Sequence, residues 1–240
     1  MSAENFSDLA HRLTIALRLE TAPIAIAFSN RAGDAPPFGA TPPPPNEAGR
    51  TGAVPAGCVF WMKATDRTFS TSASDHANCS VGSYTHGLID LATAATRDDV
   101  AAVLAAGWVD EAAVTQLPHV RARPESITYG PLAECVALPD VVLIRVDGLG
   151  LMGLHGAIRD LRVEGRPQCH IVALAKEEGA VAASVGCALS RARTGMPSEQ
   201  MTCAIPGTRL REVVGWLEST VALDRTMANY AAGDAKRFRS

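Results

Sequence analysis

The chain contains 240 residues, of which 47% are hydrophobic and 20% are charged, and it carries a net charge of −3. Such a chain can bury a substantial core, and its acidic balance argues against a nucleic-acid-binding surface. No apolar run is long enough to cross a membrane, and the first residues lack the basic start and apolar stretch of a signal peptide. We therefore expect a cytoplasmic protein that binds neither nucleic acid nor membranes.

The first third of the chain predicts a helix, a strand and an insertion. Residues 5–20 have the apolar spacing of an amphipathic helix, and residues 23–28 form an apolar run typical of a strand buried on both faces. Residues 34–55 are rich in Pro and Gly, which predicts a surface insertion without a core of its own, or a lid over a site. A short helix is then expected from Cys58, followed by a strand of small residues at 68–73.

The middle of the chain predicts two capped helices, at 96–106 and after Asp110, and an edge strand at 127–129. Residues 148–161 have helical spacing, although four glycines weaken that prediction. Further strands are predicted at 140–146, 180–185 and 201–205.

The end of the chain predicts a polar loop at 190–200, an amphipathic helix at 208–221 and a tail at 222–240. The alternation of short apolar runs with helical segments is typical of proteins that mix helices with one sheet. We expect a single mixed α/β domain over residues 1–240, with a mixed sheet flanked by helices.

The two halves of the chain share an order of parts. In the first half an apolar strand leads to Cys58, then to a small-residue strand, then to Cys79. In the second half an apolar strand leads to Cys169, then to a small-residue strand, then to Cys187. Two such units would pack as pseudo-symmetric halves and bring their post-strand loops to one end of the sheet, where α/β sites lie. Chance similarity is the alternative, because the halves share little identity.

Residues 72–88 concentrate reactive groups. They include the thiol of Cys79, the imidazoles of His76 and His86 and the carboxylate of Asp75. Almost none of these residues suits a core, so we expect the stretch to form the floor of a cofactor or substrate site. Either histidine could act as a general acid, donate to a cofactor or bind a metal; a solvated loop histidine is the alternative for each.

Short motifs along the chain resemble those of one protein family. They are Pro23-Ile24-Ala25-Ile26, Gly57-Cys58 with Lys63-Ala64, Cys79-Ser80-Val81-Gly82 with Gly87-Leu88, the strand from Asp140, Gly186-Cys187, and the run from Met196 to Arg209. This ordered set, over roughly residues 10–220, resembles the DUF169 family of bacterial and archaeal proteins. The resemblance implies a single domain with a cysteine-bearing site, and no particular reaction. The cysteines that match the family pattern are Cys58, Cys79 and Cys187.

Three thiolates brought together from distant loops suit either a zinc ion or a [4Fe–4S] cluster. We favour a cluster at Cys58, Cys79 and Cys187, because the chain has no Cys-x-x-Cys pair of the zinc-ribbon kind. With three cysteine ligands, one iron would stay open to a substrate. Gly82 would let the backbone approach such a bulky cofactor closely. Three buried thiols without a metal are the alternative.

The positions of the cysteines predict different environments. Cys58 is expected at a helix N-terminus, a position that lowers the pKa of a thiol and favours the thiolate. Cys135 lies on a packing segment and Cys169 begins an apolar run, so both are expected as core thiols. Cys203 could reach the rim of the site.

Arg191, Arg193 and Arg209 follow the last site cysteine and the final strand, where a guanidinium could bind a substrate carboxylate or phosphate; a charged surface loop is the alternative. We expect an iron–sulfur enzyme of redox or lyase type that acts on a small anionic molecule. The alternatives are a non-catalytic cofactor-binding or electron-transfer module and a zinc-binding protein. We also expect a homodimer, because apolar helix faces surround Trp108 and Trp216.

Overall fold

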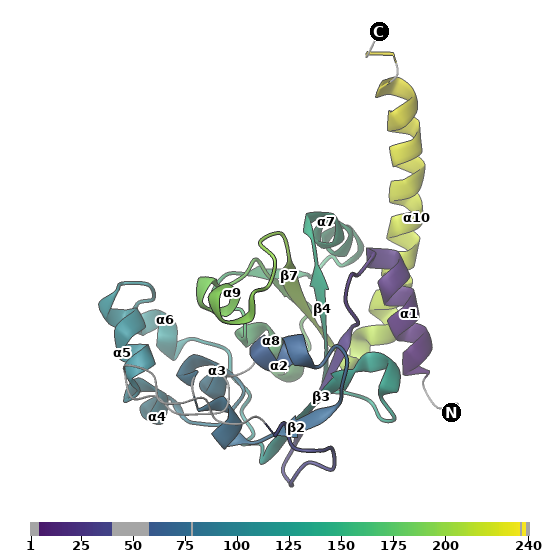
Figure 1. Ribbon diagram of the computed structural model, residues 1–240. Coiled ribbons are helices and arrows are strands. Elements are labelled where there is room, and N and C mark those ends of the chain that lie inside the picture. Colours follow the sequence, from purple (N-terminus) through teal and green to yellow (C-terminus); the bar gives the residue numbers. More distant parts are fainter. Residues whose placement is uncertain (1–4, 40–57, 78, 236, 239–240) are drawn as a thin grey trace.

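Seven strands form one mixed sheet within the residues that the structure, a computed structural model, describes: 5–39, 58–77, 79–235 and 237–238. The strands are β1 (Ile24–Ser29), β2 (Phe69–Thr71), β3 (Ser126–Pro131), β4 (Val141–Val146), β5 (Arg162–Glu164), β6 (Ala182–Ser184) and β7 (Met201–Pro206). Their order is β2-β3-β1-β4-β7-β6-β5, and neighbours are antiparallel except β5 and β6, which are parallel (Figure 1).

Helices and short 3-10 turns connect the strands. The α-helices are α1 (Phe6–Leu17), α2 (Cys58–Lys63), α3 (Ser80–Thr85), α4 (Leu91–Ala95), α5 (Asp98–Ala105), α6 (Glu111–Thr115), α7 (Gly148–Ala157), α8 (His170–Glu178), α9 (Ala188–Thr194) and α10 (Leu210–Ala235). The 3-10 turns are η1 (Ala73–His76), η2 (Leu132–Glu134) and η3 (Gly207–Arg209). The predicted glycine-rich helix forms as α7, since Asp147 caps it by accepting the N–H of Gly150 at 2.7 Å.

The sheet separates two apolar cores, because successive side chains on a strand point to opposite faces. On β1, Ile24 and Ile26 belong to the core built with α2 and α8, whereas Ala25 belongs to the core built with α1, α7 and α10. The helices α2 and α8, which begin at or just after cysteines, therefore lie on one face of the sheet.

The two halves of the sheet have the same arrangement. β1 and β4 lie antiparallel at its centre, where Ala25 pairs with Val142. Outward from this pair the order is β1, β3, β2 on one side and β4, β7, β6 on the other, where β5 adds one more edge strand. The strands β3 and β7 each end in a proline, Pro131 or Pro206, which a 3-10 turn follows. The repeated order of parts in the sequence thus corresponds to two similar halves about a central pseudo-twofold axis.

The predicted mixed α/β class and helix-flanked mixed sheet are confirmed, and a strand lies in each of the five predicted apolar segments. The edge position predicted for 127–129 is wrong. These residues belong to β3, which pairs with β1 on one side and β2 on the other, and Ile127 and Tyr129 are fully buried. The edge strand β5 was not predicted, because it has only three residues and two of them are exposed.

Two predicted boundaries near the C-terminus are also wrong. The polar loop predicted at 190–200 contains the end of α9. The helix predicted at 208–221 continues as α10 to Ala235, so the predicted tail is largely helical. Between residues 222 and 235 the chain has no proline, and its one glycine is Gly233. Figure 1 shows the last turns of α10, in yellow, projecting beyond the body of the molecule.

The Pro-rich insertion predicted at 34–55 lies mostly outside the described residues, since the structure does not describe 40–57. Its beginning packs on the sheet: Phe38 is buried, and Pro37 forms a bridge with Ser70 of β2. Within the described part of the chain, none of the helices combines the length and the apolar character needed to cross a membrane.

Candidate cofactor site

Four cysteines, each at the start of a different helix, line one cavity with a volume of about 160 Å³. Cys58 is the first residue of α2, and Cys79, Cys169 and Cys187 immediately precede α3, α8 and α9. Three of these four are the cysteines predicted to form a site. Cys169 lines the cavity too, although its sequence context predicts a core thiol.

Two short strands, β2 and β6, lead toward Cys79 and Cys187. β2 and β6 each consist of three buried residues, and both cysteines have extended backbones, with φ of −143° and −141°. Gly186 has φ +118°, and a Cβ there would lie 2.8 Å from Nη2 of Arg191, so this turn requires glycine. Gly82 lines the cavity, and its backbone hydrogen-bonds the Cys79 side chain.

Polar contacts link the two halves across the cavity. Arg193 on α9 donates from Nη1 to Sγ of Cys79 at 3.1 Å. Gln168 donates from Nε2 to Oγ of Ser190 at 2.6 Å, and the Ser190 side chain in turn hydrogen-bonds Cys58. Neither Gln168 nor Ser190 could be identified from the sequence, because a single amide or hydroxyl carries no spacing signal.

Burial keeps the thiols of Cys58, Cys79 and Cys169 in their neutral form. It raises the pKa of Cys58 to about 11, although the hydrogen bond to Ser190 opposes the change. Burial also raises the pKa of Cys79, and it raises that of Cys169 well above its usual range. The lowered pKa predicted at Cys58 is not found, because desolvation outweighs its position at a helix start. A cationic group in the cavity would reverse this balance, since thiols that bind metals are deprotonated.

The four thiols are not grouped as ligands of a single ion. Among the residues that the structure describes, no three or more His, Cys, Asp or Glu side chains are arranged to hold a metal ion. Zinc requires its sulfur ligands at about 2.3 Å from one atom, whereas a cluster spreads its thiolates over separate irons. The cavity of about 160 Å³ is also more than ten times the roughly 10–15 Å³ that holds one water molecule by the same measure. Four cysteines are the usual ligands of a [4Fe–4S] cluster, so a lining of this kind would suit one.

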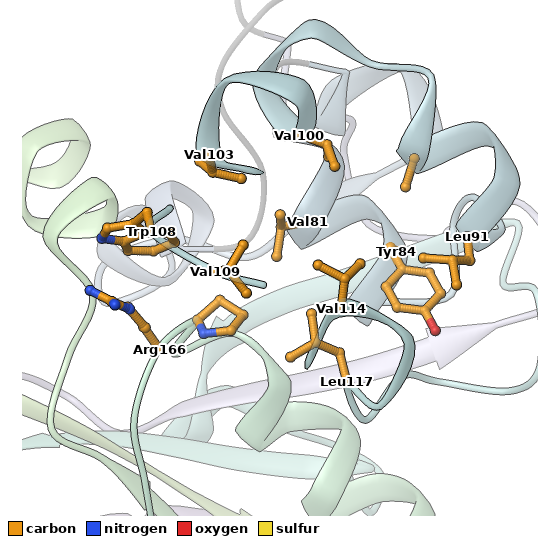
Figure 2. Close-up of a pocket in the computed structure, with 12 residues that line it drawn as sticks. Val81, Tyr84, Leu91, Val100, Val103, Trp108, Val109, Val114, Leu117 and Arg166 are labelled. Carbon is orange, nitrogen blue, oxygen red and sulfur yellow. The ribbon is translucent and has the colours of Figure 1, made fainter. Parts of the chain in front are cut away.

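An apolar pocket, shown in Figure 2, shares part of its lining with the cysteine cavity. Its volume is only about 30 Å³, and it shares Val81, Val103, Trp108 and Pro167 with the lining of the cysteine cavity. The guanidinium of Arg166 lies over the Trp108 ring, 4.6 Å from the ring centroid. The four shared residues thus give one side of the cysteine cavity an apolar lining.

His76 and His86, the predicted catalytic candidates, are completely buried and are not among the residues that line the cavity. Nε2 of His76 lies 3.0 Å from Oγ1 of Thr71, and Nδ1–H of His86 donates to the carbonyl oxygen of Gly82 at 2.8 Å. Burial lowers the pKa of both rings, to about 4 for His86, so both are neutral near pH 7. His86 thus supports the helix that carries Gly82.

Of the three predicted substrate-binding arginines, Arg193 alone lines the cavity. Arg191 donates to the backbone carbonyl of Gln200 at 2.7 Å and so shapes the loop between α9 and β7. Arg209 forms an ion pair with Asp160 at 2.9 Å. The contacts of Arg191 and Arg209 are those of residues that support the fold.

Cys135 and Cys203 lie on the opposite face of the sheet. Cys203 is fully buried in the core beneath α1 and α10, and Cys135 packs against that same core. No disulfide joins any of the six cysteines. These two thiols are therefore separated by the sheet from the four that line the cavity.

The fold and the cavity together define a class of protein: a mixed α/β domain of two similar halves that share a cysteine-lined cavity. The chain belongs to the DUF169 family, described as an uncharacterised ArCR family, whose model matches residues 12–215. The family predicted from the sequence motifs is thereby confirmed. No curated protein and no solved structure matches the chain.

Proposed function

We propose that the chain is an iron–sulfur protein that holds a [4Fe–4S] cluster in the cysteine cavity, with Cys58, Cys79 and Cys187 among its ligands. The observation that carries this proposal is that these thiols, from three separate helix starts, line one cavity of about 160 Å³. The raised pKa values of Cys58 and Cys79 support it, because buried neutral thiols become stable thiolates when they bind a cationic group.

We propose a redox role. A cluster bound by cysteines takes up and releases single electrons at a potential that nearby charges, hydrogen bonds and solvent exposure set. In this chain Arg193 brings a positive charge to the Cys79 sulfur, and the backbone of Gly82 adds a second hydrogen bond there. The apolar lining at Val81 and Trp108 would limit water on one side. The proposal includes a cytoplasmic location, because thiols stay reduced in that compartment.

The second candidate is an enzyme with one open iron that acts on a small anionic substrate by redox or lyase chemistry. The observation that favours it is the polar corner of the cavity, where Arg193 and Asp99 line the wall beside Cys79. A guanidinium there could bind a carboxylate or phosphate. A zinc-binding protein is a third candidate, which metal analysis separates from the first two.

The test is the iron and acid-labile sulfide content of anaerobically purified protein, measured with its visible spectrum. We expect about four irons and four sulfides per chain and a broad absorption near 400 nm that dithionite bleaches. Cys79→Ala should lose most of this iron, whereas Cys203→Ala, on the opposite face of the sheet, should keep it. Zinc without sulfide, or full iron retention in Cys79→Ala, would contradict the proposal.

A further inference from the structure

The two halves of the fold correspond residue by residue at their strand ends. Ile24 of β1 pairs with Pro131, and Val141 of β4 pairs with Pro206. The N–H that follows each proline then bonds back to the carbonyl that precedes the paired strand, from Leu132 at 2.8 Å in one half and from Gly207 at 2.9 Å in the other. This agreement defines which parts of the two halves are equivalent.

The cysteines that follow the short strands are equivalent under this correspondence. β2 pairs antiparallel with β3, as β6 does with β7. After each short strand the chain reaches a cysteine with an extended backbone that precedes a helix, Cys79 before α3 and Cys187 before α9. Cys79 and Cys187 are therefore counterparts, and the proposed site uses both of them.

The helices that precede the short strands are equivalent as well. Cys58 begins α2, and Cys169 immediately precedes α8. Across the halves α2 packs against α9, and α8 packs against α3. If α2 corresponds to α8 and α3 corresponds to α9, these two contacts are equivalent. The counterpart of Cys58 is therefore Cys169.

Cys169 also faces the same groups as the other three cysteines. It lines the same cavity, and its thiol is close enough to Cys79, Cys58 and Cys187 for their charges to act on it. Its neighbour Gln168 reaches Ser190, which contacts Cys58. The apolar run that predicts a core position describes α8 itself, and Cys169 lies just before that helix.

We infer that Cys169 is the fourth cluster ligand, so that each half of the molecule contributes two cysteines. The inference rests on the proposed iron–sulfur function and adds a consequence for it. With four cysteine ligands, each iron is bound by the protein and none is open to a substrate, which favours electron transfer over chemistry at an open iron.

The experiment compares Cys169→Ala with its counterpart Cys58→Ala and with Cys203→Ala, a buried thiol on the other face of the sheet. All are reconstituted anaerobically with iron and sulfide, then analysed for both elements and by electron paramagnetic resonance after dithionite reduction. We expect Cys169→Ala and Cys58→Ala each to hold less than about half of the wild-type iron, and Cys203→Ala to match wild type.

A second variant separates loss of a ligand from loss of folding. Cys169→Ser changes one atom, and its hydroxyl can still reach an iron, so we expect a cluster with a shifted resonance spectrum and potential. Wild-type iron and an unchanged spectrum in both Cys169 variants, beside iron loss in Cys58→Ala, would overturn the inference and leave the proposed function intact. Wild-type protein that binds no iron and sulfide would overturn both.

Discussion

Arg193 brings a cation to a cavity cysteine, since its Nη1 lies 3.1 Å from Sγ of Cys79. Burial disfavours its charge, but the neighbouring Cys79, Cys58 and Asp99 outweigh that effect, and the pKa of Arg193 is raised. Its positive charge would stabilise the more negative, reduced state of a cluster. We expect Arg193→Gln to lower the reduction potential by on the order of 50 mV relative to wild type.

Anaerobic potentiometric titration followed by absorbance measures this shift. Arg193→Lys keeps the charge and should recover much of the difference, which distinguishes an electrostatic role from a packing role. A potential that is unchanged in Arg193→Gln would show that the guanidinium does not act on the redox group.

His86 should make the protein less stable in mild acid. Burial holds its pKa at about 4, whereas an unfolded histidine titrates near 6.5, so the unfolded state binds the extra proton first as pH falls. This contribution is absent above about pH 6.5, grows as pH falls, and levels off below about pH 4. It amounts to about 2 kcal/mol of lost unfolding free energy at pH 5.

Urea unfolding of wild type and His86→Asn at pH 7.5 and pH 5.0 measures this effect. The asparagine amide can still donate to the Gly82 carbonyl but does not titrate. The loss of stability between the two pH values should therefore be smaller in His86→Asn by about 2 kcal/mol. Equal losses in the two proteins would contradict the buried neutral state of His86.

At the residue scale, the sequence predicted three of the four cysteines that line the cavity. It failed for Cys169, because a cysteine beside an apolar run resembles a small buried hydrophobe. It also could not foresee that His76 and His86 would be buried, since residues 72–88 look like an exposed polar loop and their burial depends on packing against Phe60 and Trp61.

At the scale of elements, the turn from β6 into α9 depends on one glycine. Gly186 has φ +118°, and an added Cβ would lie 2.8 Å from Arg191. We expect Gly186→Ala to cost about 1–3 kcal/mol of unfolding free energy and to lower iron content by displacing Cys187.

Gly215→Ala is the matched control for this substitution. Gly215 lies within α10, and a Cβ there would meet no atom within 4 Å, so alanine should stabilise the protein by about 0.5–1 kcal/mol. Thermal unfolding and iron analysis of both variants measure these outcomes. If Gly186→Ala were as stable as wild type, the position before Cys187 would not require a residue that tolerates a positive φ.

The sequence predicted elements well where local pattern decides them, as in α1 and the central strands β1 and β4. It predicted less well the features that depend on contacts between distant segments of the chain. The segment 127–129 has the composition of an edge strand, but β2 pairs with its outer side and makes β3 an interior strand. The end of α10 was placed too early because its second half has few large apolar residues, and these do not pack against the core.

At the scale of the whole molecule, the end of α10 carries large apolar side chains that are exposed. Its last turns project beyond the body, and Leu223, Met227 and Tyr230 are 68%, 61% and 69% exposed (Figure 1). Their spacing places them on one stripe of the helix. We propose that this stripe packs against the same stripe of a second copy, which agrees with the homodimer expected from the sequence.

Light scattering at micromolar concentration tests this proposal. We expect a dimer mass for wild type, a monomer mass for Leu223→Glu combined with Tyr230→Glu, and a dimer mass for the control Ala232→Glu on the opposite side of α10. Unchanged iron content in the double variant would show that the cofactor site does not need the second copy. A monomeric wild type would contradict the proposal.

We propose that four cysteines, two from each half of the molecule, bind one iron–sulfur cluster. The Mössbauer spectrum of protein reconstituted with ⁵⁷Fe reports the ligands of each iron in such a cluster. We expect all of the iron in sulfur-coordinated sites of one kind, as four cysteine ligands require. A distinct site that holds about a quarter of the iron would contradict the role of Cys169 as a ligand. Protein that binds neither iron nor sulfide would contradict the presence of a cluster altogether.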